Sequence, residues 1–364
     1  MKIISLILIL TEDCNFRCKY CYQTRDNRYM NWETAKQTLD FLSPAMKKNT
    51  GITFSGGEPF LAFPLMKKVV SYLKSKNRAP AKSKKFSVST NGSFLDNEAL
   101  DFLDQNRFRV ELSFDGRSQN RARRKNSFAK TVAVIKKIVE RKHISFGTNS
   151  TFTPAAVTTI CKSIECIISL GVRKISVSLD LTRRWNRPSL TKLAGEMSGL
   201  RELTLQHYRK TGAIPVTLFR AEKEKGIWQC PAGSNHLTVT PSGEIWGCPT
   251  FYEYFKGKAA TPAYREFYFG KSTGFTEDFE KMYRKISSHY RRFRMDNYYT
   301  TDSRCFLCPL VEKCGVCPVL RKPSNHPLLY VPPYICEINK ILIDEMENFA
   351  RELKTGQPFI SFSC

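Results

Sequence analysis

The first 215 residues alternate between short runs rich in β-branched residues and longer segments with the apolar spacing of a helix. Because strands that alternate with helices pair in parallel through right-handed crossovers, this pattern predicts an α/β fold of six strand–helix units. Six units make an incomplete barrel or a strongly curved sheet, and we expect a partial (β/α)6 TIM-like barrel with its ligand site at the carboxyl ends of the strands. The expected strands are residues 4–10, 52–55, 85–90, 109–114, 144–152 and 173–181.

The composition and periodicity of the sequence change after about residue 215, where helical periodicity fades and Gly, Pro, Tyr and Cys become frequent. Residues 251–274 are aromatic and basic, and residues 305–336 are dense in Cys and Pro. Apolar residues spaced three and four apart predict a last helix over 336–354. We therefore predict a barrel domain at 1–215, a smaller cysteine-rich domain at 216–336, and a C-terminal helix and tail at 337–364.

The chain is strongly basic, with 58 Lys and Arg against 33 Asp and Glu and a formal charge of +25. This excess favours an anionic partner such as an acidic peptide, a nucleic acid or a membrane surface, although a solvated basic exterior accounts for it equally well. The apolar run from Ile3 to Leu10 is too short to span a bilayer and is read as a buried strand. No other segment resembles an anchor, so we expect a cytoplasmic protein that binds no membrane.

Thirteen cysteines are many for such a chain, and most of them are clustered. Disulfide frameworks belong to small secreted domains, so clustered spacings here point to metal. The stretch TEDCNFRCKYCYQ, residues 11–23, carries Cys14, Cys18 and Cys21 as C-x3-C-x2-C directly after the first strand. An iron–sulfur cubane normally takes four thiolates, so three leave one iron open for a non-protein ligand. A structural zinc ion would need four closed ligands.

This loop resembles the cluster motif of the radical S-adenosylmethionine enzymes, in which the cofactor's amino and carboxylate groups chelate the open iron and an electron from the cluster releases a 5′-deoxyadenosyl radical. Further motifs follow in the order of that family at the ends of the next strands: SGGEP at 55–59, STNG at 89–92 and LSFDG at 112–116. The resemblance implies that Asp115 shapes the same rim. It implies cofactor contacts from Tyr20, Gly56, Gly57, Glu58, Asn91 and Ser113.

Seven cysteines of the C-terminal part resemble the SPASM extension, which carries two auxiliary 4Fe–4S clusters and is found on maturases of peptides and proteins. The spacing departs from that family at one point, because two residues instead of three separate Cys314 from Cys317. The resemblance implies three 4Fe–4S clusters and S-adenosyl-L-methionine as cofactors, and the alternative for the tail is a pair of zinc-ribbon-like sites. It assigns Cys305, Cys308, Cys314 and Cys336 to one auxiliary cluster, and Cys230, Cys248 and Cys317 to the other.

The overall layout also resembles the anaerobic sulfatase-maturating enzymes, which oxidise a Cys or Ser side chain to formylglycine. In that family an aspartate base directly follows the second auxiliary cysteine, whereas this chain has Pro249 there, so Glu253 or a nearby tyrosine would have to replace it. We therefore favour a maturase of a ribosomally made peptide (a RiPP), which forms a thioether or other crosslink or inverts a stereocentre. For an inversion, Cys364 is a candidate hydrogen donor, while Cys161 and Cys166 are expected in the core.

The expected partners are a peptide or protein substrate, acidic if the charge serves it, and an external electron donor of the flavodoxin or ferredoxin type. Leader-peptide binding would fall to the basic, aromatic residues 251–304 or to a separate protein. A different class of function, RNA modification, is suggested by the charge and by interleaved aromatics such as residues 264–269. No RNA-binding fold is recognisable, so a nucleic-acid partner is disfavoured, and a non-catalytic cluster scaffold is disfavoured because the cofactor motifs look intact.

Overall fold

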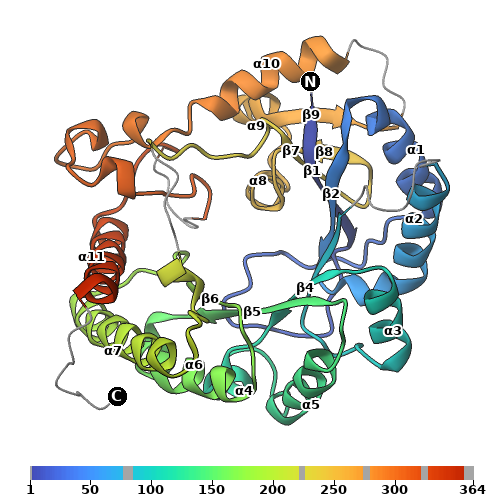
Figure 1. Ribbon diagram of the computed structural model, residues 1–364. Helices are drawn as coiled ribbons and strands as arrows, with labels where there is room; N and C mark the ends of the chain where they lie inside the picture. The colour runs from blue at the N-terminus through green and yellow to red at the C-terminus, as the bar shows by residue number, and fades with distance from the viewer. Residues whose placement is uncertain (1, 77–84, 221–225, 274–278, 321–326, 356–364) are drawn as a thin grey trace.

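A computed structural model describes residues 2–76, 85–220, 226–273, 279–320 and 327–355. Figure 1 shows strands on the inside of an open ring and helices around its outside. The predicted α/β partial barrel and the C-terminal helix are confirmed. Among the described residues, none of the helices has the length and apolar character that a membrane span requires.

One continuous sheet runs through the described chain in the order β6-β5-β4-β3-β2-β1-β7-β8-β9. Neighbours from β6 to β7 are parallel, while β8 and β9 are antiparallel to the strands beside them. All six strands predicted for the first 215 residues are present. The strands are β1 (Ile3–Thr11), β2 (Met46–Gly56), β3 (Lys85–Thr90), β4 (Arg109–Ser113), β5 (Ser145–Phe152), β6 (Ile175–Leu179), β7 (His236–Val239), β8 (Glu244–Trp246) and β9 (Tyr268–Lys271).

Helices of the first half cover the outer face of the sheet (Figure 1). Local capping fixes where several of them begin: the Asn31 side chain accepts from Thr34 N at 2.8 Å, and Asp96 accepts from Ala99 N at 2.9 Å. The helices are α1 (Trp32–Leu42), α2 (Phe63–Lys76), α3 (Asn97–Gln105), α4 (Gln119–Ala122), α5 (Phe128–Val139), α6 (Ile160–Ser169), α7 (Arg187–Thr211), α8 (Pro249–Phe255), α9 (Pro262–Phe267), α10 (Phe279–Arg291) and α11 (Pro333–Thr355).

The core lies between the sheet and these helices. Phe54 of β2 and Phe86 of β3 stack on Phe108, which precedes β4, with ring centroids 5.9 and 5.5 Å from that of Phe108. All three side chains are buried, as alternation along half-buried strands requires. The outer faces of the strands therefore hold the helices, and their carboxyl ends are left to carry polar residues.

The C-terminal half continues the sheet of the first half. Leu8 at the centre of β1 pairs with Phe54 of β2 on one side and with Val239 of β7 on the other. At the far end of the ring, α11 lies beside α7 (Figure 1), where Arg201 forms ion pairs with Glu345 at 2.6 Å and Glu352 at 3.3 Å. The chain thus closes against its own first half at both edges of the barrel.

The aromatic residues between 251 and 293 form a second core. Phe251, Phe267, Phe269 and Tyr290 are fully buried, and the rings of Phe251 and Tyr290 lie 4.7 Å apart. Rings that fill a core are not available to stack on bases, which applies to Phe267 and Phe269 of residues 264–269, whereas Tyr264 and Tyr268 are half-buried.

Candidate active site

A cavity of about 440 Å³ opens at the carboxyl ends of the parallel strands. Its wall is built from the loop after β1 and from the ends of β2 to β6, the position that a barrel of this kind gives to its ligand. The C-terminal half adds Thr250 and Leu320 to the wall. Eight of the residues expected to bind the cluster or the cofactor line this one cavity: Cys14, Cys18, Tyr20, Cys21, Gly56, Gly57, Asn91 and Ser113.

Backbone hydrogen bonds shape the cysteine loop. Asp13 Oδ1 accepts from Cys14 N at 2.7 Å, and Phe16 N donates to Cys14 Sγ at 3.4 Å. Cys21 N donates to Cys18 O at 3.1 Å, which closes the second half of the loop. The loop is therefore ordered by its own residues, and the three thiols project from it into the cavity wall.

The turn after β2 touches the cysteine loop backbone to backbone. A Cβ at Gly56 would lie 2.1 Å from Thr11 O, and one at Gly57 would lie 2.1 Å from Asp13 O. Gly56 also has φ of 134°, a conformation that favours glycine. Both glycines are therefore required for this close approach, which brings the ends of β1 and β2 into one wall.

Glu58 stands apart from the expected cofactor contacts, because it is fully buried and does not line the cavity. Its carboxylate accepts from Thr90 Oγ1 at 2.7 Å and from Asn91 N at 2.8 Å. Burial raises the pKa of Glu58 to about 7. Glu58 thus ties the end of β2 to the end of β3 and holds Asn91 at the rim, where Asn91 Nδ2 donates to Asn15 Oδ1 at 2.9 Å.

The buried residues Asp115 and Arg123 anchor the half-buried Tyr20. Its hydroxyl donates to Asp115 Oδ2 at 2.5 Å, and Arg123 donates to Asp115 Oδ1 at 2.9 Å. The Arg123 guanidinium lies over the Tyr20 ring, 5.3 Å from its centroid. Asp115 therefore supports the rim from beneath, as Tyr20 and Arg123 line the cavity.

Arg123 was not singled out from the sequence, where it lies in the basic run RARRK at 121–125. Arg121 and Arg124 are exposed, whereas Arg123 is buried with its Nε lacking a partner among the described residues. The one signal in the sequence was Asp115, since a buried carboxylate after a strand needs a cation.

Burial makes the thiols of the loop weaker acids than a free cysteine. The pKa of Cys18 rises to about 11, and those of Cys14 and Cys21 are also raised. Metal binding would therefore have to displace protons. Within the described ranges, no three Cys, His, Asp or Glu side chains converge closely enough to hold a single metal ion.

The C-terminal cysteines gather in two places. A second cavity of about 410 Å³ is lined by four of them, and Asn339 Nδ2 donates to Cys314 Sγ there at 3.2 Å. This grouping matches the first auxiliary set that the sequence resemblance implied. The four cysteines are Cys305, Cys308, Cys314 and Cys336.

The other group is Cys230, Cys248 and Cys317. Burial raises the pKa of Cys230 to about 12, and the nearby Cys248 and Cys317 raise it further. Tyr290 holds this region together, because its hydroxyl accepts from Gly247 N at 3.0 Å and donates to Phe267 O at 2.8 Å. The cysteines that are far apart in the sequence are therefore neighbours.

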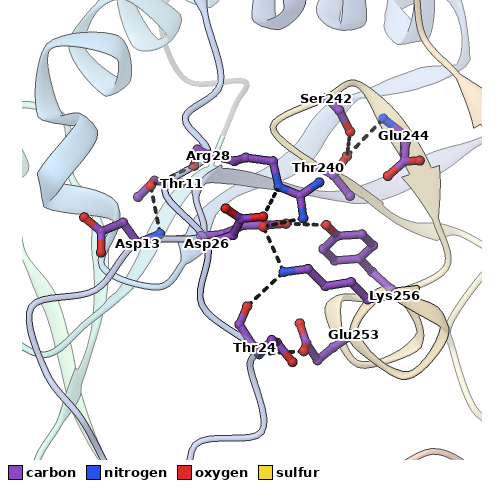
Figure 2. Close-up of polar contacts among 12 residues, drawn as sticks. Thr11, Asp13, Thr24, Asp26, Arg28, Thr240, Ser242, Glu244, Glu253 and Lys256 are labelled. Atoms are coloured by element: carbon purple, nitrogen blue, oxygen red, sulfur yellow. Dashed lines mark hydrogen bonds and ion pairs between the residues drawn. The ribbon is translucent and has the colours of Figure 1, made fainter. Parts of the chain in front are cut away.

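Helix α8, directly after Cys248, grips the segment that follows the cysteine loop. Figure 2 shows Arg28 and Lys256 converging, with Thr24 between Lys256 and Glu253. The buried Glu12 carboxylate accepts from Arg28 and from Lys256, each at 2.9 Å, and from the Tyr252 hydroxyl. This network joins the first half of the chain to the second at the edge of the cavity.

The remaining candidates lie outside the main cavity. Glu253 is buried and accepts from Thr24 N at 2.5 Å, so its carboxylate fixes the loop instead of facing the cavity. Cys161 is buried and Cys166 half-buried in α6, and Cys161 N donates to Glu196 at 2.8 Å. Cys364 lies outside the described residues.

Comparison with known proteins identifies the superfamily. Residues 8–154 match the sequence profile of the Radical SAM superfamily. Residues 8–154 are therefore a radical SAM domain. Membership implies a 4Fe–4S cluster and S-adenosylmethionine as cofactors, and the match covers β1 to β5 with the cysteine loop and the strand ends described above.

Two curated relatives and one solved structure place the chain more closely. It is 23% identical over 374 residues to the radical SAM cyclopropyl synthase TigE of Paramaledivibacter caminithermalis, covering 94% of this chain and 73% of TigE. It is 27% identical over 164 residues to a cysteine-type anaerobic sulfatase-maturating enzyme of Clostridium novyi, covering 40% of this chain and 43% of that enzyme. Its fold is similar to anSMEcpe with bound AdoMet and Cp18Cys peptide, with a TM-score of 0.73, 17% identity, and coverage of 96% and 99%.

Proposed function

We propose that this chain is a radical SAM enzyme, a maturase that modifies a ribosomally made peptide by crosslinking, thioether formation or epimerisation. The observation that carries the proposal is the central cavity of about 440 Å³, where three thiols and the ends of the neighbouring strands surround a space of small-molecule size. The C-terminal half contributes to the same wall, which supports a substrate held between the two halves.

The residues around this cavity fit a cofactor chelated by a cluster. Three thiols leave one iron of a cubane without a protein ligand. The tight turn at Gly57 holds the cysteine loop against the end of β2, because a Cβ there would lie 2.1 Å from Asp13 O. The buried Nε of Arg123, which has no partner among the described residues, offers a donor to an anionic group.

When bound, the cluster and S-adenosylmethionine supply one-electron chemistry that starts with hydrogen abstraction from the substrate. Cys14, Cys18 and Cys21 would hold the cluster as thiolates. Tyr20, fixed by Asp115, would lie against the adenine, while Asn91, held in place by Glu58, would order the rim. The chain thus binds and orients, and the cavity wall keeps water from the reacting atoms.

A SPASM domain at 216–336 is the second part of the proposal, between the barrel at 1–215 and the helix and tail at 337–364. Its two 4Fe–4S clusters would be held by the two cysteine groups, one with four thiols and one with three. In the three-thiol group the fourth iron would be open or take a ligand other than cysteine.

The substrate part of the proposal is supported by the relatives. TigE covers most of this chain, and a structure of similar fold holds a peptide. The charge of +25 favours an acidic peptide. An external flavodoxin- or ferredoxin-type donor would reduce the clusters in the cytoplasm. A leader peptide would be bound by residues 251–304 or by a separate protein.

A second candidate is formylglycine generation on a sulfatase, favoured by the similarity to the Clostridium novyi enzyme. The position after Cys248 is Pro249, whose side chain cannot accept a proton as a base. The carboxylate of Glu253, four residues later, accepts a hydrogen bond from Thr24 N. These contacts rank the peptide maturase first.

Cleavage of S-adenosylmethionine tests the proposal. Anaerobically reconstituted and reduced protein should release 5′-deoxyadenosine, and Cys18→Ala should abolish the release. Cys166→Ala is the matched control, because Cys166 lies on α6 away from the cavity. If Cys14, Cys18 and Cys21 can all be replaced by alanine without loss of cleavage, the cofactor assignment fails.

Iron content tests the SPASM part. Replacing the seven C-terminal cysteines should remove about two-thirds of the iron, since two of three cubanes go with them. A loss near zero would mean that these cysteines hold something else. Mass spectrometry of candidate peptides co-expressed with the enzyme would then identify the modified residue.

A further inference from the structure

Arg25 is a charged side chain in the wall of the central cavity that the expected chemistry does not use. It follows the cysteine loop and lines the cavity, as do Gln23, Thr250 and Leu320. Its Nη1 nitrogen is buried and has no hydrogen-bond partner in the part of the chain that the structure describes. A buried cationic donor without a partner is costly, so such a group points to a ligand.

Four carboxylates near the cavity and the loop are already matched with other cations, whereas a fifth, Glu111, lines the cavity itself. Glu12 pairs with Arg28 and Lys256, and Asp26 pairs with Arg28 at 2.8 Å. Asp115 pairs with Arg123 at 2.9 Å, and Asp180 pairs with Arg183 at 3.1 Å. No carboxylate of these four is left to neutralise Arg25.

The backbone directly before Arg25 is held in place through both polar groups of Thr24. Thr24 N donates to Glu253 Oε1 at 2.5 Å, and Thr24 O accepts from Lys256 Nζ at 2.9 Å. Both partners belong to, or directly follow, α8 of the C-terminal half. The guanidinium is therefore presented from a fixed backbone, which lowers the entropy lost when a ligand binds.

We propose that Arg25 is the carboxylate-binding group of the central cavity, and that the carboxylate belongs to an acidic side chain or the C-terminus of the peptide substrate. Guanidinium groups match carboxylates through two parallel hydrogen bonds. Arg123 already offers its free Nε beside Tyr20, whereas Arg25 lines the same cavity from the segment after the cysteine loop. This inference rests on the proposed maturase function.

Binding measurements on the full reconstituted protein test the inference without turnover. The probes are S-adenosylmethionine and a fluorescein-labelled, end-blocked peptide of alternating Glu and Gly, with the Gln and Gly peptide as its neutral counterpart. Arg25→Gln should weaken the acidic peptide by about tenfold to a hundredfold, the loss of hydrogen bonds to a charged group, and leave the neutral peptide unchanged. Arg25→Lys should lose less affinity for the acidic peptide, because lysine keeps the positive charge but not the paired N–H donors of the guanidinium group.

Two controls separate contact from general charge. Lys192→Gln removes one positive charge from the exposed face of α7 and should not change the affinity for the acidic peptide. Glu111, which also lines the cavity, allows a double variant, Arg25→Gln with Glu111→Gln, that restores the net charge of the wall. If Arg25 contacts the carboxylate, the double variant should still bind the acidic peptide weakly. If the affinity recovers, only the electrostatic potential of the cavity matters, and the proposal is overturned.

The remaining outcomes are distinct. A loss of S-adenosylmethionine affinity alone overturns the assignment to the peptide, because Arg25 would then bind the cofactor's own carboxylate. Equal affinities of the wild type and Arg25→Gln for both probes overturn the inference, provided that iron content and visible absorbance show both proteins to be loaded. Cleavage of S-adenosylmethionine by the same wild-type preparation would then leave the proposed function standing, whereas its absence would reject that function.

Discussion

Gly57→Ala tests whether the close backbone contact between the turn after β2 and the cysteine loop positions that loop. The added Cβ would lie 2.1 Å from Asp13 O and 2.9 Å from Glu12 O, both backbone atoms. Since carbon contacts settle near about 3.5 Å, the Asp13 carbonyl would have to move by roughly 1 Å. That movement breaks the backbone hydrogen bond of 2.9 Å that Glu58 N donates to Asp13 O. We expect a stability cost of about 1–3 kcal/mol from overpacking.

The larger effect of Gly57→Ala should be on function, because a misplacement of about 1 Å at a reacting centre costs on the order of a hundredfold in rate. The measurements are the rate of 5′-deoxyadenosine release, the affinity for S-adenosylmethionine and the iron content. Gly195→Ala in α7 is the matched control, since no atom lies within 4 Å of its added Cβ. If Gly57→Ala cleaves S-adenosylmethionine as fast as Gly195→Ala, the close backbone contact at Gly57 does not affect the reaction and the reasoning is refuted.

Two further predictions concern buried carboxylates. Glu12→Gln should lower the free energy of unfolding by about 3 kcal/mol, because it leaves the half-buried Lys256 without its partner; denaturant unfolding measures this, and an unchanged midpoint would contradict it. Burial raises the pKa of Glu58 to about 7 from an ordinary value of 4.5, so the folded state binds more protons and stability should fall as pH rises between these values. The fall should reach about 3 kcal/mol relative to Glu58→Gln, and parallel pH profiles of the two proteins would contradict it.

The sequence predicted the barrel well because its signals are local. Each strand has its own β-branched run, and the cysteine, glycine and asparagine motifs come directly after successive strands. Parallel strands bring such positions to one edge, so the gathering of Cys14, Gly56, Asn91 and Ser113 around one cavity followed from chain order alone.

The polar contacts behind the site were not predictable in this way. Thr24 and Glu253 are 229 residues apart in the chain, and no spacing rule connects them. Glu58 belongs to a motif that suggests a cofactor contact, yet its carboxylate turns inward to Thr90 and Asn91. These outcomes depend on which buried groups find partners, and that is decided by tertiary packing.

A chain ending at residue 215 should not form a working barrel, although the sequence changes texture there. Such a chain loses β7, so β1 would become an exposed edge strand, and its central Leu8 would lose its partner Val239. Glu12 would keep only Arg28, which is 42% exposed, and lose the contacts from Tyr252 and Lys256 that bury it. We expect aggregation on expression and no binding of S-adenosylmethionine. A soluble, monomeric fragment that binds the cofactor as the full chain does would show instead that the cysteine loop needs no support from the C-terminal half.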